Sequence, residues 1–184
     1  MDELICQHDF DWSGNYITDG DLNGLFGNLP KGVQLEVFLD SCHSGTGLRN
    51  LDLGRPADLG PTNPTLMRYL PPPIDIVCRH EGEEDDLKKT RLFDSARDAQ
   101  SELILWAGCR SDQTSADAFI DGKYNGAFTY YYCYHKRKAN GQITRAELLA
   151  RIRSSLHHGC YSQVPQLETD ATARAGQALR PTNN

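Results

Sequence analysis

The chain has 184 residues, of which 39% are hydrophobic and 24% are charged, so it can bury the core of one globular domain. Its net charge of -6 argues against a nucleic-acid partner, because phosphate backbones select basic surfaces, and is compatible with a basic substrate. The first residues, Met1 to Leu4, lack the features of a signal peptide, and no apolar run approaches the roughly 18 residues that span a membrane. The six cysteines are scattered without a C-x-x-C pair, so we expect reduced thiols in a cytoplasmic protein with no membrane partner.

The first predicted elements are a short helix and a strand. Thr18 to Asp21 fit a capping box, and apolar residues follow at helical spacing up to Leu29, before Pro30. Alternating apolar and polar residues then predict a strand over 33–39. This strand leads directly into the run Asp40-Ser41-Cys42-His43-Ser44-Gly45.

The segment 47–100 differs in composition from the rest of the chain. It contains a proline-rich part, an acidic run and several basic residues. Such a stretch cannot bury much surface, so we expect a flexible loop.

Regular structure is predicted again after this loop. A continuous apolar run indicates a strand at 102–107, and a polar loop follows over 108–117. We expect helices at 127–138, where basic residues suit the helix C-terminus, and from Thr144, where a second capping box stands. A short strand is possible at 164–167.

Strands that alternate with helices predict an α/β domain with a mostly parallel sheet. Ligands of such sheets bind at the carboxyl ends of the strands. Asp40, Cys42 and the 108–117 loop all follow strand ends, so we expect Asp40, Cys42 and Asp112 to lie close together.

Cys42 is the strongest candidate for chemistry. A thiol in a tight loop directly after a strand is held rigidly near the surface, as nucleophilic catalysis requires, together with a base that forms the thiolate. The alternative is a buried structural cysteine, since free cysteines are among the most buried residues. These residues alone do not favour function over structure. We interpret the adjacent His43 as a spacer, because neighbouring side chains project in different directions.

The stretch Phe38 to Thr46 resembles the nucleophile motif of metacaspases and the related prokaryotic caspase homologues. Four further segments resemble the same family in the same order. They are Asp2-Glu3 with Cys6 to Asp9, Ile17 to Asp19 with Asp21-Leu22, Gly108 to Ala118 with Gly126 to Tyr130, and Gln163 to Glu168. Five ordered motifs are far more specific than one short pattern.

The resemblance implies a single caspase-like peptidase domain over 1–184, a three-layer α/β/α fold with a mostly parallel central sheet. Its expected parts are the end of the large-subunit part with the nucleophile at 1–46, the flexible loop at 47–100, the small-subunit part at 101–170, and a polar tail at 171–184.

The resemblance makes Cys42 the nucleophile of a cysteine endopeptidase that requires no cofactor and cuts protein or peptide substrates after Arg or Lys. It makes Asp40 part of the floor of the pocket for the basic side chain, which a carboxylate recognises by charge and hydrogen bonds. Without the family, Asp40 would be a turn or cap residue at a strand end. Asp112 and Gln113 are further candidate substrate-binding residues. Basic residues of the loop match this specificity and are candidate self-cleavage sites, namely Arg79, Lys88, Lys89 and Arg91.

The catalytic histidine of the family pattern has no clear counterpart. Caspase-type enzymes carry it about 50 residues before the cysteine, whereas residues 1–41 precede Cys42. His8 lies in a segment that resembles a place after the family's His-Gly motif, so we interpret it as surface or structural. We expect the base, one oxyanion donor and the first strands of the sheet upstream of Met1, and we expect this chain alone to be inactive. The alternative hypothesis is an inactive caspase-like module that binds or scaffolds.

Asp9, Asp19 and Asp21 fall where many metacaspases bind an activating Ca²⁺, and carboxylate oxygens suit this ion. Arg49 and Gly20, however, stand where the family has acidic residues. We therefore expect weak or absent calcium dependence, and we favour ordinary acidic residues at a helix N-terminus.

Overall fold

A computed structural model describes residues 4–6, 10, 12, 14, 16–41, 65–67, 102–110 and 113–169. The chain forms two compact units, one of Met1–Leu35 with Leu70–Leu103 and the other of Glu36–Tyr69 with Ile104–Asn184. Each unit is described by itself below.

The first unit contains a small hairpin and a helix. β1 (Leu4–Cys6) pairs antiparallel with β2 (Tyr16–Thr18), a hairpin that the sequence did not predict. α1 (Asp19–Gly27) follows directly. Its capping box is complete, since Asp21 N donates to Thr18 Oγ1 at 3.0 Å and Thr18 N donates to Asp21 Oδ2 at 2.9 Å. The predicted helix and its cap are therefore confirmed.

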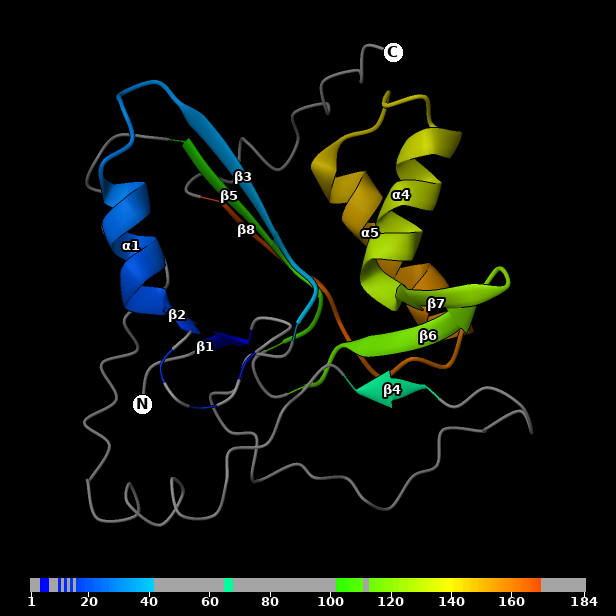
Figure 1. Cartoon of the computed structure of the whole chain (residues 1–184). Helices are drawn as coiled ribbons and strands as arrows, with labels where there is room; N and C mark the ends of the chain where they lie inside the picture. Colours follow the sequence, from blue (N-terminus) through cyan, green and yellow to red (C-terminus); the bar gives the residue numbers. More distant parts are fainter. Residues whose placement is uncertain are drawn as a thin grey trace. The chain divides into compact units, whose positions relative to one another are not determined.

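The main sheet has the order β3-β5-β8, formed by β3 (Gln34–Leu39), β5 (Glu102–Ala107) and β8 (Gln166–Thr169). In Figure 1, β3 and β5 lie side by side and run in the same direction. β8 pairs antiparallel with β5, with Ala107 opposite Gln166. The predicted strands 33–39 and 102–107 are thus parallel neighbours, and the predicted α/β class is confirmed.

β8 begins two residues later than the strand predicted at 164–167. The backbone of the two earlier residues is bound elsewhere. Val164 N donates to the Gln113 side chain at 2.8 Å, and Pro165 O accepts two bonds from the Arg153 guanidinium. These contacts occupy groups that a strand ladder would need.

A second sheet has the order β4-β6-β7. It consists of β4 (Leu66–Met67), β6 (Ala116–Ile120) and β7 (Lys123–Gly126). β6 and β7 form a hairpin whose two-residue turn, Asp121-Gly122, has φ values of 56° and 81°. An Asp-Gly pair between two strands is the usual signal for such a turn, so this hairpin was predictable. Because β6 begins at Ala116, the polar loop predicted at 108–117 ends at Ser115.

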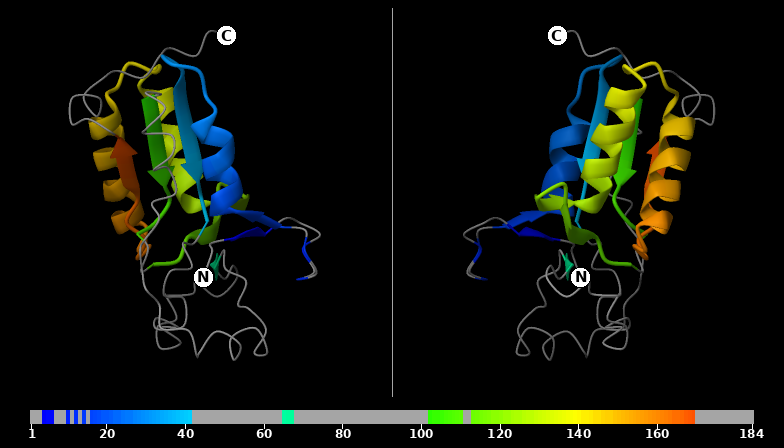
Figure 2. Two further views of the ribbon diagram at one scale, coloured as in Figure 1. Left: turned by 90° about the vertical axis from the view of Figure 1, so that its left-hand side faces the viewer. Right: turned by 90° about the vertical axis from the view of Figure 1, so that its right-hand side faces the viewer.

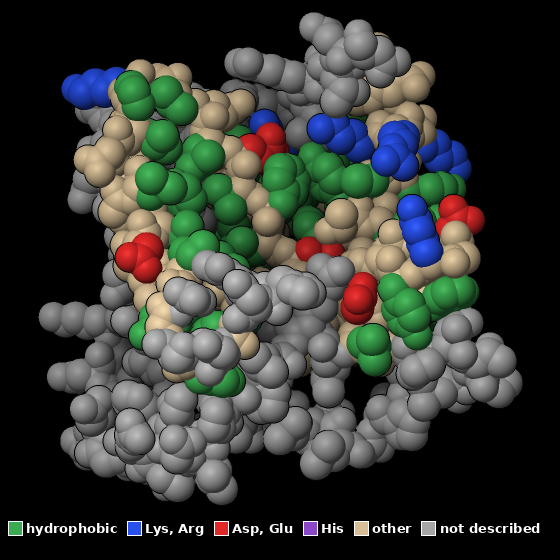
Figure 3. Space-filling model, viewed as in Figure 1, with side chains coloured by type: hydrophobic (Ala, Val, Ile, Leu, Met, Phe, Trp, Pro, Cys, Tyr) green, Lys and Arg blue, Asp and Glu red, His purple; other side chains and the backbone are tan. Residues whose placement is uncertain are grey.

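Two helices follow β7 and pack on each other, α4 (Ala127–Lys138) and α5 (Arg145–His158), at the positions predicted. Figures 1 and 2 show them together on one side of the β3-β5-β8 sheet. The basic last turn of α4 belongs to the blue side chains at the upper right of Figure 3.

The hydrophobic core lies between these helices and β5. Ile104 and Trp106 point the same way from β5 because strand residues alternate, and both are fully buried with Phe128, Leu148 and further apolar residues of α4 and α5. Leu105 and Ala107 are buried too, which explains the continuous apolar run of this strand.

A partly buried ion pair borders the core. Arg145, only 4% exposed, donates from Nε to Glu36 Oε1 at 3.1 Å, and Trp106 Nε1 donates to the same oxygen at 2.8 Å. Burial, and then the nearby Glu36 carboxylate, raise the pKa of Tyr132 far above its usual range. This cluster ties β3 to β5 and to the start of α5. Among the described helices, none is long and apolar enough to cross a bilayer.

Candidate active site

The carboxyl ends of β3 and β5 meet at one hydrogen bond. Gly108, the residue after β5, donates from its backbone N to Leu39 O, the last residue of β3, at 2.7 Å. Asp40 and Ser41 follow immediately on β3. Cys42 and Asp112 lie outside the described residues. The structure therefore brings Asp40 to the 108–110 segment as predicted, but leaves the predicted positions of Cys42 and Asp112 untested.

The Asp40 carboxylate accepts hydrogen bonds from Ser115, which precedes β6, and from Thr129 in α4. Ser115 Oγ donates to Oδ1 at 2.9 Å, and Thr129 donates to Oδ2 from its backbone N at 3.1 Å and from Oγ1 at 2.6 Å. Ser115 is fully buried, Asp40 is half-buried and Thr129 is exposed. The carboxylate thus sits between a buried donor and a donor at the surface.

Thr129 is the third residue of α4, and Gly126 at the N-cap provides no side-chain hydrogen bond. The N–H groups of a first helical turn lack partners within the helix, and the helix dipole favours a negative charge there. Asp40, which follows β3, supplies a hydrogen-bond acceptor for the Thr129 N–H and a negative charge at this helix end. It therefore acts as the side-chain cap of α4.

Gly108 allows this close approach. A Cβ atom at Gly108 would lie 2.7 Å from Ser115 Oγ and 2.9 Å from Asp40 Oδ1, distances that Cβ atoms do not adopt. The lack of a side chain at this position is therefore required for the bond between Ser115 and Asp40.

Gln163 holds the segment that carries Ser115. Its side chain is 3% exposed, donates from Nε2 to Gly108 O at 3.0 Å, and accepts from Ala116 N at 2.8 Å. It thereby joins the end of β5 to the start of β6. Ser115, Thr129 and Gln163 all lie in segments that carry the family resemblance, but the sequence did not reveal that Ser115 and Thr129 bond Asp40 or that Gln163 holds the Ser115 segment.

Gln113, predicted to bind substrate, has its amide engaged by backbone groups. Nε2 donates to Ser162 O at 2.7 Å, and Oε1 accepts from Val164 N at 2.8 Å and from Arg110 N at 3.4 Å. The buried thiol of Cys109 donates to Gln113 O at 3.3 Å. These contacts join the loop after β5 to the segment before β8, and a role of Gln113 in substrate binding stays a prediction.

The acidic residues proposed for calcium are only partly described. Asp21 Oδ2 accepts from Thr18 Oγ1 and N, and these hydrogen bonds lower the pKa of the Asp21 carboxyl. Asp9 lies outside the described residues, as does the side chain of Asp19. Within the described residues no group of three His, Cys, Asp or Glu side chains could hold a metal ion. Asp21 has the cap role that we favoured, and calcium dependence stays a prediction.

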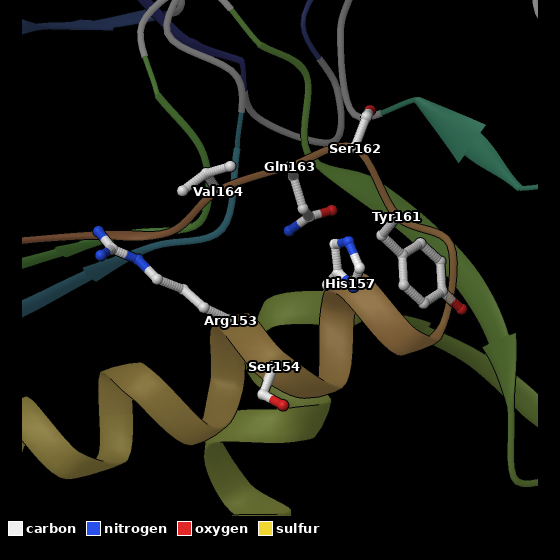
Figure 4. A pocket seen from close by; sticks show the side chains of 7 residues that line it. All are labelled: Arg153, Ser154, His157, Tyr161, Ser162, Gln163 and Val164. Atoms are coloured by element: carbon white, nitrogen blue, oxygen red, sulfur yellow. The ribbon is translucent and has the colours of Figure 1, made fainter.

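A pocket of about 470 Å³ lies beside the C-terminal half of α5 (Figure 4). It is lined by Arg153, Ser154, His157, Tyr161, Ser162, Gln163 and Val164. Arg153 is bound to Pro165 O, and Gln163 reaches Gly108 as described above. Nothing in this lining forms a nucleophile with its base.

The described histidines all belong to α4 and α5. His135 Nε2 is 2.8 Å from Ser155 Oγ, and His158 Nδ1 is 2.7 Å from Ser154 O. His157 lines the pocket beside α5. We therefore assign the general base to none of these three residues. His8, which we interpreted as surface or structural, lies outside the described residues.

Comparisons with known proteins indicate one family. A family model described as "Metacaspase, peptidase C14 domain" matches residues 1–51, which include Asp40 and Cys42. Metacaspase-1 of Coccidioides immitis is 30% identical over 90% of the chain, and metacaspase-1B of Aspergillus oryzae is likewise 30% identical over 90%. The chain spans 39% and 43% of these two relatives.

A solved structure shows the same fold. The crystal structure of a protein from Geobacter sulfurreducens superposes with a TM-score of 0.64 at 26% identity, covering 96% of this chain and 61% of that protein. The α/β fold, the strand-end carboxylate and the family match define a caspase-like protein. Over 90% of its length the chain is similar to metacaspases, a family of cysteine peptidases.

Proposed function

We propose that the protein is a cysteine endopeptidase that cleaves peptide bonds after Arg or Lys, with Cys42 as nucleophile and Asp40 as the group that recognises the basic side chain. The observation that carries this proposal is the position of Asp40. It lies at the carboxyl end of β3, two residues before Cys42, with its carboxylate half-buried and held between Ser115 and Thr129. A carboxylate in such a place binds a guanidinium or ammonium group by charge and hydrogen bonds.

The chemistry follows from a thiolate at Cys42. The sulfur attacks the scissile carbonyl carbon, the C–N bond breaks, and the leaving amine takes up a proton. Water then attacks the thioester, releases the acid product and restores the thiol. A base must form the thiolate and donate the proton to the amine, and we expect it from a histidine other than His135, His157 and His158. Calcium has no step in this scheme.

The proposed setting is the cytoplasm. The four described cysteines, Cys6, Cys109, Cys133 and Cys160, are free thiols, which is usual in a reducing compartment. The proposed partners are proteins or peptides with exposed Arg or Lys.

Fluorogenic peptides that differ only in the residue before the scissile bond test the specificity. In a form of the protein that turns over peptides, we expect cleavage after Arg and Lys, no cleavage after Asp, and loss of cleavage in Cys42→Ala. Asp40→Asn should reduce kcat/KM on the Arg peptide by about 10²-fold or more, because the substrate guanidinium loses the half-buried carboxylate with which it pairs. Iodoacetamide should still alkylate Cys42 in this variant.

Asp121→Asn is the matched control, since it removes one acid from a turn in which Asn is equally suited. It should leave the specificity unchanged. Equal cleavage after Asp and Arg, or an Asp40→Asn variant with full activity on the Arg peptide, would refute the assignment of Asp40.

A further inference from the structure

The two oxygens of Asp40 are held in different ways. Oδ2 accepts two hydrogen bonds from Thr129, one from the backbone and one from the hydroxyl, and these occupy both of its lone pairs. Oδ1 accepts from the buried Ser115 hydroxyl. Donors on both oxygens define the plane of the carboxylate as well as its position.

Asp40, Ser115 and Thr129 come from three separate parts of the chain. Asp40 follows β3, Ser115 precedes β6, and Thr129 lies in the first turn of α4. Gln163 ties the Ser115 segment to Gly108, and the absence of a Cβ at Gly108 leaves the space in which Ser115 and Asp40 form their hydrogen bond. The orientation of the carboxylate is thus determined by the packing of this unit and not by the β3 segment alone.

We propose that Ser115 and Thr129 are positioning residues that orient the Asp40 carboxylate for a basic side chain and thereby determine the affinity for Arg and Lys. This inference rests on the proposed function, because it names the residues through which Asp40 acts. A carboxylate that rotates freely recognises a guanidinium less well than a fixed one, since bonds to Arg depend on planar geometry.

The hydroxyl of Thr129 can be removed without removing the backbone bond. Thr129→Val keeps the shape of the side chain and the backbone N–H that Asp40 caps, but removes the hydroxyl donor to Oδ2. Thr129→Ser keeps the hydroxyl. Ser115→Ala removes the donor to Oδ1, and Thr114→Val is a control at the neighbouring half-buried position.

The first measurement is binding of agmatine, an alkyl guanidinium, to the 184-residue chain by NMR titration. Butylurea serves as the uncharged control. We expect the Kd for agmatine to rise about fivefold or more in Thr129→Val and in Ser115→Ala, since a hydrogen bond to a charged group is lost. In Thr129→Ser and Thr114→Val the Kd for agmatine should stay within about twofold of the wild-type value, which is less than the change expected from the loss of one such bond. Asp40→Asn should abolish saturable binding.

The second measurement uses a form of the protein that turns over peptides. The ratio of kcat/KM for an Arg peptide to that for the matched citrulline peptide should fall in Thr129→Val, through KM and not kcat, and Thr129→Ser should restore it. A variant that merely unfolds would lose both substrates equally, and its NMR spectrum would show this directly.

The outcomes separate the two proposals. If Asp40→Asn removes recognition but Thr129→Val and Ser115→Ala leave it intact, the positioning roles are wrong and the proposed function stands. If the wild type neither binds agmatine in preference to butylurea nor prefers Arg to citrulline, both proposals are wrong.

Discussion

The Thr129 hydroxyl donates a hydrogen bond of 2.6 Å to Asp40 Oδ2, across 89 positions of the sequence. With the backbone bond from Thr129 N, it attaches the first turn of α4 to the end of β3. The residue that we propose for substrate recognition therefore also caps the N-terminus of a helix.

Replacement of Asp40 should accordingly reduce stability as well as specificity. We expect Asp40→Asn to lower the free energy of unfolding by about 1–3 kcal/mol, because hydrogen bonds to a charged acceptor and the charge at the helix N-terminus are lost. Urea denaturation of the 184-residue chain measures this. Amide exchange at Thr129 should also become faster. Exchange at Thr129 that is the same in both proteins would show that Asp40 does not cap α4.

Gly108→Ala should disrupt the same contact from the opposite side. Its Cβ would lie 2.7 Å from Ser115 Oγ, so either the Ser115–Asp40 bond or the backbone of β5 must shift. We expect a loss of about 1–3 kcal/mol of stability, as for overpacked sites. Gly24→Ala is the control, because nothing lies within 4 Å of its Cβ position and Ala is favoured in a helix by about 0.5–1 kcal/mol. A Gly108→Ala protein as stable as the wild type would contradict the close packing described here.

His135 should make stability depend on pH. Burial, and then the positive charges of Arg151 and Lys138, lower its pKa below the ordinary value of 6.5. The unfolded chain therefore binds a proton at this ring more readily than the folded chain. Stability from this residue is present above pH 6.5 and falls as the pH drops below it. Urea midpoints between pH 5 and 7.5 should show a smaller slope in His135→Asn than in the wild type, and an equal slope would exclude this residue as the source.

Self-processing is expected from the proposed specificity. The candidate sites Arg79, Lys88, Lys89 and Arg91 all lie outside the described residues. An active form of the protein should cut itself after one or more of them, giving fragments that mass spectrometry identifies by their C-terminal residue. Cys42→Ala should prevent these cuts. The same fragments in the mutant would indicate a different protease.

The 184-residue chain alone should not turn over an Arg peptide, with or without calcium. None of the three described histidines is assigned as the base, and without a base a thiol with an ordinary pKa of about 8.5 is only a few per cent thiolate at neutral pH. Turnover that Cys42→Ala abolishes would place a base within this chain. His8→Ala would then test the most suitable residue outside the described helices.

The sequence alone determined the local structure wherever the signal was local. The capping box at Thr18 and the N-cap at Thr144 set where α1 and α5 begin, and the apolar run at 102–107 indicated the strand β5. The Asp121-Gly122 turn was equally local, and its hairpin was missed although the pair signals it. The position of Asp40 at a strand end was also evident from the order of the elements.

The partners of Asp40 were decided only by the tertiary structure. A carboxylate at a strand end indicates a possible cap or pocket residue, but nothing in the sequence names Ser115 and Thr129 as its donors. These bonds span 75 and 89 positions, and they form because β5, β6 and α4 pack around a glycine without a side chain. Hydrogen bonds between distant residues depend on how whole elements pack, and no local pattern encodes that packing.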